Sequence, residues 1–506
     1  MKIDFLKRIK KEIKTDRKTY FLLLLILVFS FFFRVYRVGD LLGFYYDQGR
    51  DALKILEMIK FQDFPAIGPT TGIEGLFLGP FWFYLLAPFY FLGNGNPVVA
   101  AIAISFFDLG AIIMLFLIGR EFFSKRVGLL ASFFWGFSYY FICSARWFSN
   151  PSPLPFFSLL LIFSLLKFFI KKKNNYLILA SLSLSLALQL EIASAIFYIP
   201  IILVLFLIFK PLKTSKKTFF ASGLIFFALL IPQILFEFKN NFLTLKNFLI
   251  FSKGEINTNN KTWAIPSFAF IKARIYSYKE IFFSRLDVDT NFFSSFFSVL
   301  FLIFSILLLK REKLKSASGI LLVFLVLPLI LLLFFSGNYA RLYDYYLTGF
   351  FASFILLFSL FASFFLKKKI YYPIFALIII FFLNGNLIFI KDYLSTNCDK
   401  ETHISLKNEL QAIDWMYEDA DEKFNVDVYV PPVIPLAYDY LIPYRGEKKY
   451  NKLPVEERVS LLYTIYEADP PHPERLDAWL KRQEGIGRIV RQIKFGGITV
   501  ERRERL

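Results

Sequence analysis

Two aspartates and an arginine stand close together after the first apolar run of the chain, in residues 45–51 with the sequence YYDQGRD. Asp47 and Asp51 are four residues apart, so in a helix they share a face with Arg50 beside them. A carboxylate at the mouth of a membrane cavity can take a proton from a hydroxyl group or ligate a divalent metal ion. The alternative is an acidic helix N-terminus that begins near Asp47.

A second group of polar residues lies within or just after apolar runs. Arg146 and Asn150 are four residues apart at the end of such a run, and arginine suits bidentate contact with a phosphate. The alternative for Arg146 is an interfacial anchor beside Trp147. Asp108 lies inside an apolar run, where an acid faces either a watery cavity or a hydrogen-bonding neighbour on another helix.

Further candidates have ordinary structural alternatives. Glu74 lies in a glycine-rich stretch that either lets the backbone approach a ligand or forms a simple turn. Glu191 and Glu237 end apolar runs and either line a cavity or close a helix. Arg341 and Asp344 lie among four tyrosines, which indicates ligand binding or an interfacial aromatic belt.

Composition places the chain in a membrane. Of its 506 residues, 56% are hydrophobic and 20% aromatic, which is unusual for a soluble domain of this length. The formal net charge of +19 is carried largely by short clusters between apolar runs. Such clusters orient membrane proteins, so we interpret the charge as topology and not as nucleic-acid binding.

The apolar runs predict about eleven transmembrane helices. A span needs roughly 20 apolar residues. The expected spans are 19–38, 97–119, 127–145, 152–170, 176–191, 194–210, 217–237, 291–310, 317–336, 345–366 and 370–390. The first is predicted to be a retained helix because no small-residue cleavage site follows it.

One further apolar run, 76–92, decides the topology. If it crosses the membrane and the N-terminus is cytoplasmic, five basic loops lie outside, against the positive-inside rule. These loops are 120–126, 171–173, 210–217, 310–315 and 367–369. If it is an interfacial helix, all five lie inside. A first external loop, about 39–96, then carries Asp47 on the outer face.

The C-terminal part of the chain differs in composition, with dense charge, clustered prolines and short apolar runs. We predict a membrane domain over 1–390 and a small extracytoplasmic α/β domain over 391–506. Within the second domain the expected helices are 404–418 and 474–482, and the expected strands are 424–430, 459–466, 487–494 and 497–501.

At this point the chain resembles the GT-C membrane glycosyltransferases, and among them the bacterial relatives of protein O-mannosyltransferases and lipid A aminoarabinose transferases (glycosyltransferase family 39-like). The matching features are Asp47-Gln48 after the first helix, the proline-containing run 78–84, and the turn from Ser144 to Asn150. The mannosyltransferases carry Asp-Glu where this chain has Asp47-Gln48. That difference concerns the sugar and the acceptor more than the reaction type.

The resemblance implies an inverting transfer of a sugar from an undecaprenyl- or dolichyl-phosphate donor at the outer face of a prokaryotic plasma membrane. Asp47 would be the general base, and Arg146, Arg341 and Asn150 would bind the donor or its phosphate. Asp51, Arg50, Gln48, Glu74, Asp108, Glu191 and Glu237 would support or line the cavity. The acceptor could be a protein, a lipid or a polysaccharide. The enzyme could work with or without a bound divalent cation.

A transporter or flippase of lipid-linked sugars is the alternative from another class. It would use Asp47, Asp108 and Arg146 along a permeation path. Transporters usually show internal repeats and sites near the membrane midplane. Here the polar residues are expected on one outer face, which favours the enzyme.

Overall fold

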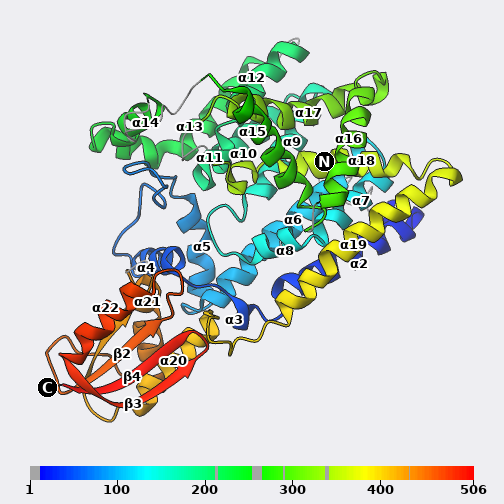
Figure 1. Ribbon diagram of the computed structural model, residues 1–506. Helices are drawn as coiled ribbons and strands as arrows, with labels where there is room; N and C mark the ends of the chain where they lie inside the picture. Colours follow the sequence, from blue (N-terminus) through cyan, green and yellow to red (C-terminus); the bar gives the residue numbers. More distant parts are fainter. Residues whose placement is uncertain are drawn as a thin grey trace.

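The computed structural model describes residues 12–210, 215–253, 265–288, 291–336, 341–431 and 434–505. A bundle of apolar helices forms most of the molecule, and a small sheet with its own helices packs at one end, as Figure 1 shows. Because a bilayer offers no partners to backbone N–H and C=O groups, helices are the expected form for its apolar runs.

Within these described ranges, six helical segments are long and apolar enough to cross a membrane. They are α2 (Arg17–Val35), α6 (Pro97–Phe122), α11 (Ile192–Ala195) with α12 (Tyr198–Phe209), α13 (Lys216–Lys239), α17 (Glu312–Leu332) and α19 (Tyr372–Leu394). A seventh is the pair α7 (Lys125–Gly136) and α8 (Tyr139–Arg146), bent by 62°. Shorter apolar helices are α5 (Phe81–Leu92), α9 (Leu154–Phe169), α10 (Tyr176–Leu190), α16 (Asn291–Leu308) and α18 (Phe351–Phe364).

Each expected span coincides with one of these helices or pairs, and the remaining apolar helix, α5, falls in the expected first external loop. The mainly α-helical membrane fold is therefore confirmed. The connecting segments hold more structure than predicted. They contain α3 (Val38–Leu41), α14 (Leu243–Lys253) and α15 (Phe268–Phe283). In the first loop, α4 (Tyr46–Ile59) begins where a helix N-terminus near Asp47 was one of the two interpretations. The short 3-10 helices η2 (Asp344–Leu347) and η3 (Lys369–Tyr371) lie at the beginning of the last two expected spans.

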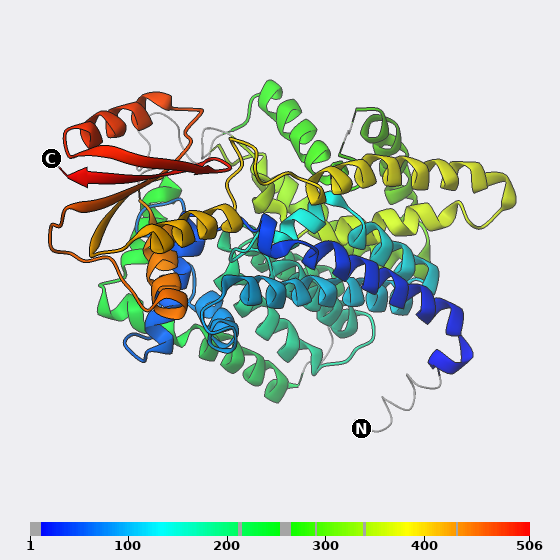
Figure 2. The ribbon, with the colours of Figure 1, turned by 90° about the horizontal axis from the view of Figure 1, so that it is seen from below.

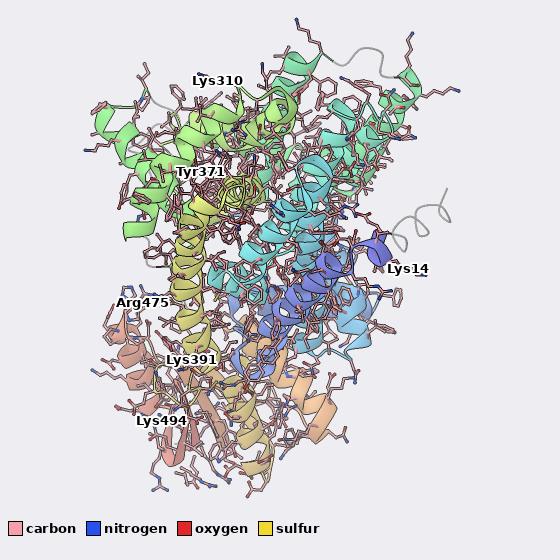
Figure 3. The ribbon with its side chains drawn as sticks, turned by 90° about the vertical axis from the view of Figure 1, so that its right-hand side faces the viewer. Lys14, Lys310, Tyr371, Lys391, Arg475 and Lys494 are labelled. Carbon is pink, nitrogen blue, oxygen red and sulfur yellow. The ribbon has the colours of Figure 1, made fainter. Side chains whose placement is uncertain are left out.

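Several basic loops gather at the end of the bundle away from the sheet. Arg120 and Lys125 pair with Glu12 and Asp16 in front of α2, at 3.1 and 2.7 Å. In Figure 3, Lys310 and Tyr371 lie far from Lys391 and Lys494. The latter two lie at the end of the molecule that carries the sheet. Both α2 and α19 begin at the end of the bundle away from the sheet and run towards the sheet (Figure 2).

The C-terminal sheet has the strand order β1-β2-β4-β3, with β1 and β2 parallel and the other pairs antiparallel. Its strands are β1 (Phe424–Tyr429), β2 (Leu461–Glu467), β3 (Gly487–Phe495) and β4 (Ile498–Arg505). The accompanying helices are α20 (Leu406–Asp419), α21 (Leu436–Arg445), the π-helix η4 (Gly446–Tyr450) and α22 (Pro473–Glu484). The small α/β sheet expected here is thus present, whereas α21, the crossover between β1 and β2, was not predicted.

This C-terminal unit docks on the segment around α3 and α4. The Leu406 amide donates to the Leu42 carbonyl at 2.9 Å, and the Tyr45 hydroxyl donates to the Ile404 carbonyl at 2.9 Å. Gly49 of α4 touches the α21 backbone so closely that a Cβ there would lie 2.3 Å from the Ala437 nitrogen. The position of α4 therefore depends on the C-terminal unit.

Two buried glutamates lie at this junction. The carboxyl oxygens of Glu409 have no protein partner among the described residues, and its side chain is fully buried. Burial, followed by the neighbouring Glu467, raises the Glu409 pKa well above its ordinary value, and burial raises the Glu467 pKa to about 7. The Tyr438 hydroxyl donates to Glu467 at 3.1 Å. Both carboxyls thus hold protons more tightly in the folded protein than in the unfolded chain.

We expect the stability of this junction to fall as pH rises. The folded state keeps protons that the unfolded chain releases above a pKa near 4.5, so stability is lost from there through about pH 7 and beyond. In Glu409→Gln a neutral amide replaces the carboxyl, so the melting temperature should depend less steeply on pH. Thermal unfolding of the purified protein between pH 5 and 9 measures this. An unchanged slope in the variant contradicts the assignment.

Candidate functional site

A cavity of about 990 Å³ opens between the first loop and the ends of several helices. Its charged and amide lining residues are Asp47, Asp108, Asn150, Glu191, Arg285 and Asp344. Its apolar lining includes Ile199, Pro200, Phe248, Phe251, Leu331 and Phe335. The chamber thus combines a few polar groups with a broad apolar wall, as ligand sites commonly do.

Asp47 stands at the beginning of α4 and is 62% exposed. The helix begins there because the Gln48 side chain accepts the Tyr45 amide at 3.1 Å. The Gln48 amide also donates to the Phe148 carbonyl at 2.8 Å, and Gln48 itself is buried. Gln48 therefore fixes α4 to the turn after α8, while Asp47 is left facing the cavity.

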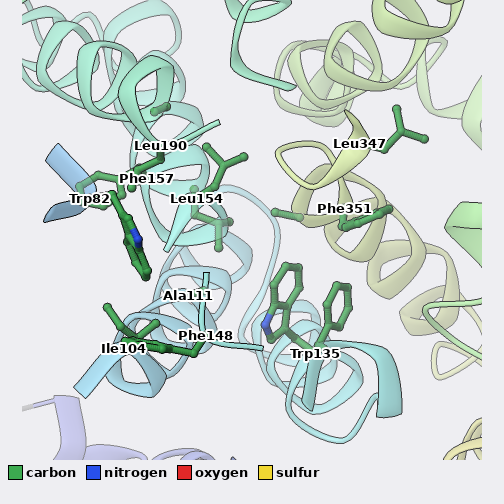
Figure 4. Close-up of a cluster of buried hydrophobic side chains, with 14 of the residues drawn as sticks. Trp82, Ile104, Ala111, Trp135, Phe148, Leu154, Phe157, Leu190, Leu347 and Phe351 are labelled. Carbon is green, nitrogen blue, oxygen red and sulfur yellow. The ribbon is translucent and has the colours of Figure 1, made fainter. Parts of the chain in front are cut away.

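Arg50 and Asp51 lie behind Asp47. Arg50 pairs with the Asp47 carboxylate at 2.8 Å and with the Asp51 carboxylate at 2.8 Å. The Trp82 indole N–H on α5 donates to the other Asp51 oxygen at 2.7 Å. Trp82 and Trp135 belong to the buried cluster drawn in Figure 4. The expected shared face of the two aspartates is present, but only Asp47 lines the cavity.

Asn150 and Glu191 form another part of the wall. The Asn150 amide donates to the Leu190 carbonyl at 2.6 Å, which ties the turn before α9 to the end of α10. Glu191 is 8% exposed and accepts the Ala193 amide at 3.1 Å, so it caps α11. Glu191 therefore does both of the things expected for it: it caps a helix and it lines the chamber.

Arg285 is the one cationic residue in the cavity lining of the described chain. It follows α15, pairs with Asp344 at 2.9 Å, and lies 4.5 and 4.4 Å from the ring centroids of Tyr140 and Phe351. Burial lowers the Arg285 pKa, and Asp344 opposes that shift. Sequence reasoning missed this residue. The signal that could have found it is a single arginine within the apolar run 281–286.

Arg146 has a different position from the one expected. It is 5% exposed, does not line the cavity, and donates from Nη1 to the carbonyls of Phe33, Arg34 and Tyr36 at 2.9–3.1 Å. These carbonyls lie at the end of α2, where backbone acceptors lack helical partners. Arg146 also contacts Tyr393 of α19. It therefore joins the ends of two membrane helices.

Asp108 lines the cavity but is occupied by structural partners. It accepts from the Arg34 Nε at 2.5 Å and from the Trp135 indole at 2.8 Å. Arg34 is fully buried, and its Nη1 donates to the Ser30 and Gly136 carbonyls. This ion pair joins α2, α6 and α7, which corresponds to the helix-packing alternative.

Three other candidates lie outside the cavity lining. Arg341 and Glu74 are exposed. Glu237 accepts the Thr244 and Leu245 amides at 3.1 and 3.0 Å, so it caps α14. In the described ranges, no group of three or more His, Cys, Asp or Glu residues is placed to hold a metal ion.

Comparisons with known proteins agree with this architecture. Residues 78–236 match a family model described as dolichyl-phosphate-mannose-protein mannosyltransferase. The crystal structure of ArnT from Cupriavidus metallidurans bound to undecaprenyl phosphate matches with a TM-score of 0.60 and 10% identity, over 96% of this chain and 98% of that chain. The fold of this chain is thus similar to that of this ArnT structure over nearly its whole length. The resemblance seen in the sequence is thereby confirmed.

A second GT-C structure also matches. Archaeal oligosaccharyltransferase AglB from Archaeoglobus fulgidus, in complex with an inhibitory peptide and a dolichol-phosphate, gives a TM-score of 0.50 and 12% identity over 94% of this chain and 73% of that chain. No curated protein matches the sequence. The apolar helices, together with the likeness to these two structures, show an integral membrane protein. The matched family segment contains Asn150 and Glu191, whereas Asp47 and Arg285 lie outside it.

The buried Arg34–Asp108 pair generates a stability prediction. Asp108→Asn removes the negative charge and leaves Arg34 uncompensated, which should cost roughly 3–5 kcal/mol in the free energy of unfolding. The melting temperature in detergent measures this loss. Ser105→Ala, one turn away on α6, is the matched control because the Ser105 hydroxyl bonds only within its own helix. A wild-type melting temperature for Asp108→Asn contradicts a structural role for the pair.

Proposed function

We propose that the protein is an inverting glycosyltransferase that moves a sugar from a polyprenyl-phosphate donor to an acceptor hydroxyl. The observation that carries this proposal is the chamber itself: an exposed carboxylate, Asp47, and a buried guanidinium, Arg285, line one cavity with a long apolar wall in a GT-C fold. A lipid-borne phosphate is the ligand that needs both a cation and an apolar surface.

In the proposed reaction, the sugar C1 loses its bond to the phosphate oxygen and gains a bond to the acceptor oxygen. The acceptor oxygen attacks C1 and its proton passes to the Asp47 carboxylate, while the C1–O bond to the phosphate breaks. The bonding electrons leave with the phosphate oxygen, which gains charge. Attack on the face opposite the leaving group inverts C1. The products are the glycosylated acceptor and the polyprenyl phosphate.

Arg285 is proposed to stabilise the leaving phosphate. Its guanidinium is held between two aromatic rings and the Asp344 carboxylate, so it is fixed in place before the donor arrives. An incoming phosphate would share or replace Asp344 as the anionic partner. This assignment moves the phosphate from Arg146 and Arg341 to Arg285, because neither of the first two lines the cavity.

Asn150 and Glu191 are proposed to contact sugar hydroxyl groups, because both are polar residues in the chamber lining. The apolar residues on α12, α14 and α17 would lie along the polyprenyl chain. The C-terminal unit, which sets the position of α4, would help to bind or shield the acceptor.

The proposed orientation places the cavity and the C-terminal sheet outside the cytoplasm. Lys310, in the basic loop 310–315, lies far from the C-terminal sheet in Figure 3, and basic loops favour the cytoplasmic side. The N-terminus would then be cytoplasmic in a prokaryotic plasma membrane. Nucleotide sugars are scarce outside the cytoplasm, so this orientation agrees with a lipid-linked donor.

Asp47→Asn tests the general base. The variant keeps the size of the side chain but cannot accept the proton, so kcat should fall by roughly 10²–10⁴-fold or below detection. Transfer is measured by mass spectrometry of products from a panel of polyprenyl-phosphate sugars. The melting temperature serves as the folding control. A fully active, folded variant contradicts the role of Asp47.

Arg285→Gln tests the phosphate contact. Loss of charged hydrogen bonds worth about 1.5–3 kcal/mol should lower kcat/KM for the donor by roughly 10- to 100-fold. Arg341→Gln is the matched control, since Arg341 is exposed and lies outside the cavity lining. Equal losses in both variants, or a loss only in Arg341→Gln, would place the phosphate elsewhere.

A further inference from the structure

The Arg50 guanidinium divides its contacts unequally between two carboxylates. Its Nε and Nη2 both donate to the Asp51 Oδ1, at 2.9 and 2.8 Å. Only Nη1 pairs with Asp47, at 2.8 Å. Most of the guanidinium is therefore directed at the residue that does not line the cavity. We name this arrangement the Asp47–Arg50–Asp51 bridge.

Asp51 is itself held rigidly. Its side chain is 5% exposed, and its second oxygen accepts the N–H of the fully buried Trp82 at 2.7 Å. The groups that face it are Arg50 and Asp47 on its own helix and, on α5, Trp82 and the Tyr90 phenol, which in turn faces Tyr440 of α21. Arg50 is the one cation among these groups.

We propose that Asp51 is a positioning residue that draws the Arg50 charge away from Asp47 and so keeps Asp47 a competent base. The proposal rests on the role of Asp47 in the proposed function. A guanidinium fully engaged with Asp47 would stabilise its carboxylate and weaken it as a proton acceptor. By taking two of the three contacts, Asp51 leaves Arg50 to orient Asp47 through a single ion-pair contact.

The bridge has a consequence for pH dependence. Burial raises the Asp51 pKa to about 6, although Arg50 and Trp82 oppose the shift. Below that pH Asp51 is protonated and loses its charge, so the Arg50 charge acts on Asp47 alone. We therefore expect kcat to fall as pH decreases through about 6. KM for the donor should change little, because Asp51 does not line the cavity.

Asp51→Asn is the direct test. The uncharged amide cannot compensate Arg50, so kcat should fall roughly ten-fold at pH 7.5 with an unchanged donor KM, and the decline near pH 6 should disappear. Glu57→Gln is the matched control. It replaces another carboxylate by an amide on α4, and Glu57 pairs with Lys54 outside the bridge. This control should keep the wild-type kcat and pH profile.

Trp82→Phe provides a second test if Asp51→Asn does not fold. It removes the indole donor to Asp51 but keeps the charge, so the decline in kcat should move to higher pH. The proposed role of Asp51 is wrong if a folded Asp51→Asn protein has the wild-type kcat. It is also wrong if the pH profile of kcat is unchanged in both variants. Absence of transfer by the wild-type protein from every lipid-linked donor would instead contradict the proposed function, which keeps the two failures distinct.

Discussion

The backbone contact between Gly49 and α21 fixes the position of the candidate site. Any side chain at Gly49 would overlap the backbone of Leu436 and Ala437, so α4 can approach the C-terminal unit only because this residue is glycine. Gln48 fastens the opposite side of α4 to the Phe148 carbonyl. Asp47 directly precedes these two residues at the start of α4. Its place at the cavity mouth thus depends on the C-terminal unit, whose first helix, α20, begins only at Leu406.

Buried charges in the bundle have two distinct uses. The Arg34–Asp108 pair and Arg146 bind helices together, and their partners are side chains and backbone carbonyls of the protein. Arg285 also has a protein partner, Asp344, but that carboxylate is 60% exposed and lines the chamber. A buried cation whose carboxylate partner faces a cavity is suited to meet an anionic ligand. The same comparison explains why Arg146 is a poorer choice for the phosphate.

The sequence was sufficient for features that depend on composition and period. Every expected span falls on an apolar helix because the bilayer constrains backbone hydrogen bonding more strongly than any local preference does. The strands of the C-terminal sheet were also found from short apolar runs. The spacing of Asp47 and Asp51 correctly indicated a shared helical face. In each case the signal lies within about 20 neighbouring residues.

What the sequence could not supply was the tertiary partner of each polar residue. Arg146 and Arg285 are both single arginines near membrane helices, and only the fold shows that one closes α2 while the other faces the chamber. Likewise, the fold shows that Asp108 is paired with Arg34 and Trp135 between helices, whereas Asp47 is exposed at the cavity mouth. The helices α14 and α15 were missed because their apolar residues are interrupted by lysines and arginines, which resembles a loop.

If the chamber holds a lipid-linked phosphate between Arg285 and the mouth at Asp47, a structure of the protein with undecaprenyl phosphate, in detergent or nanodiscs, will show it. We expect phosphate oxygens about 3 Å from the Arg285 guanidinium, with the lipid chain along Phe248 and Phe335. A phosphate bound at Arg341, or a lipid site outside this chamber, would rule out this function of the chamber.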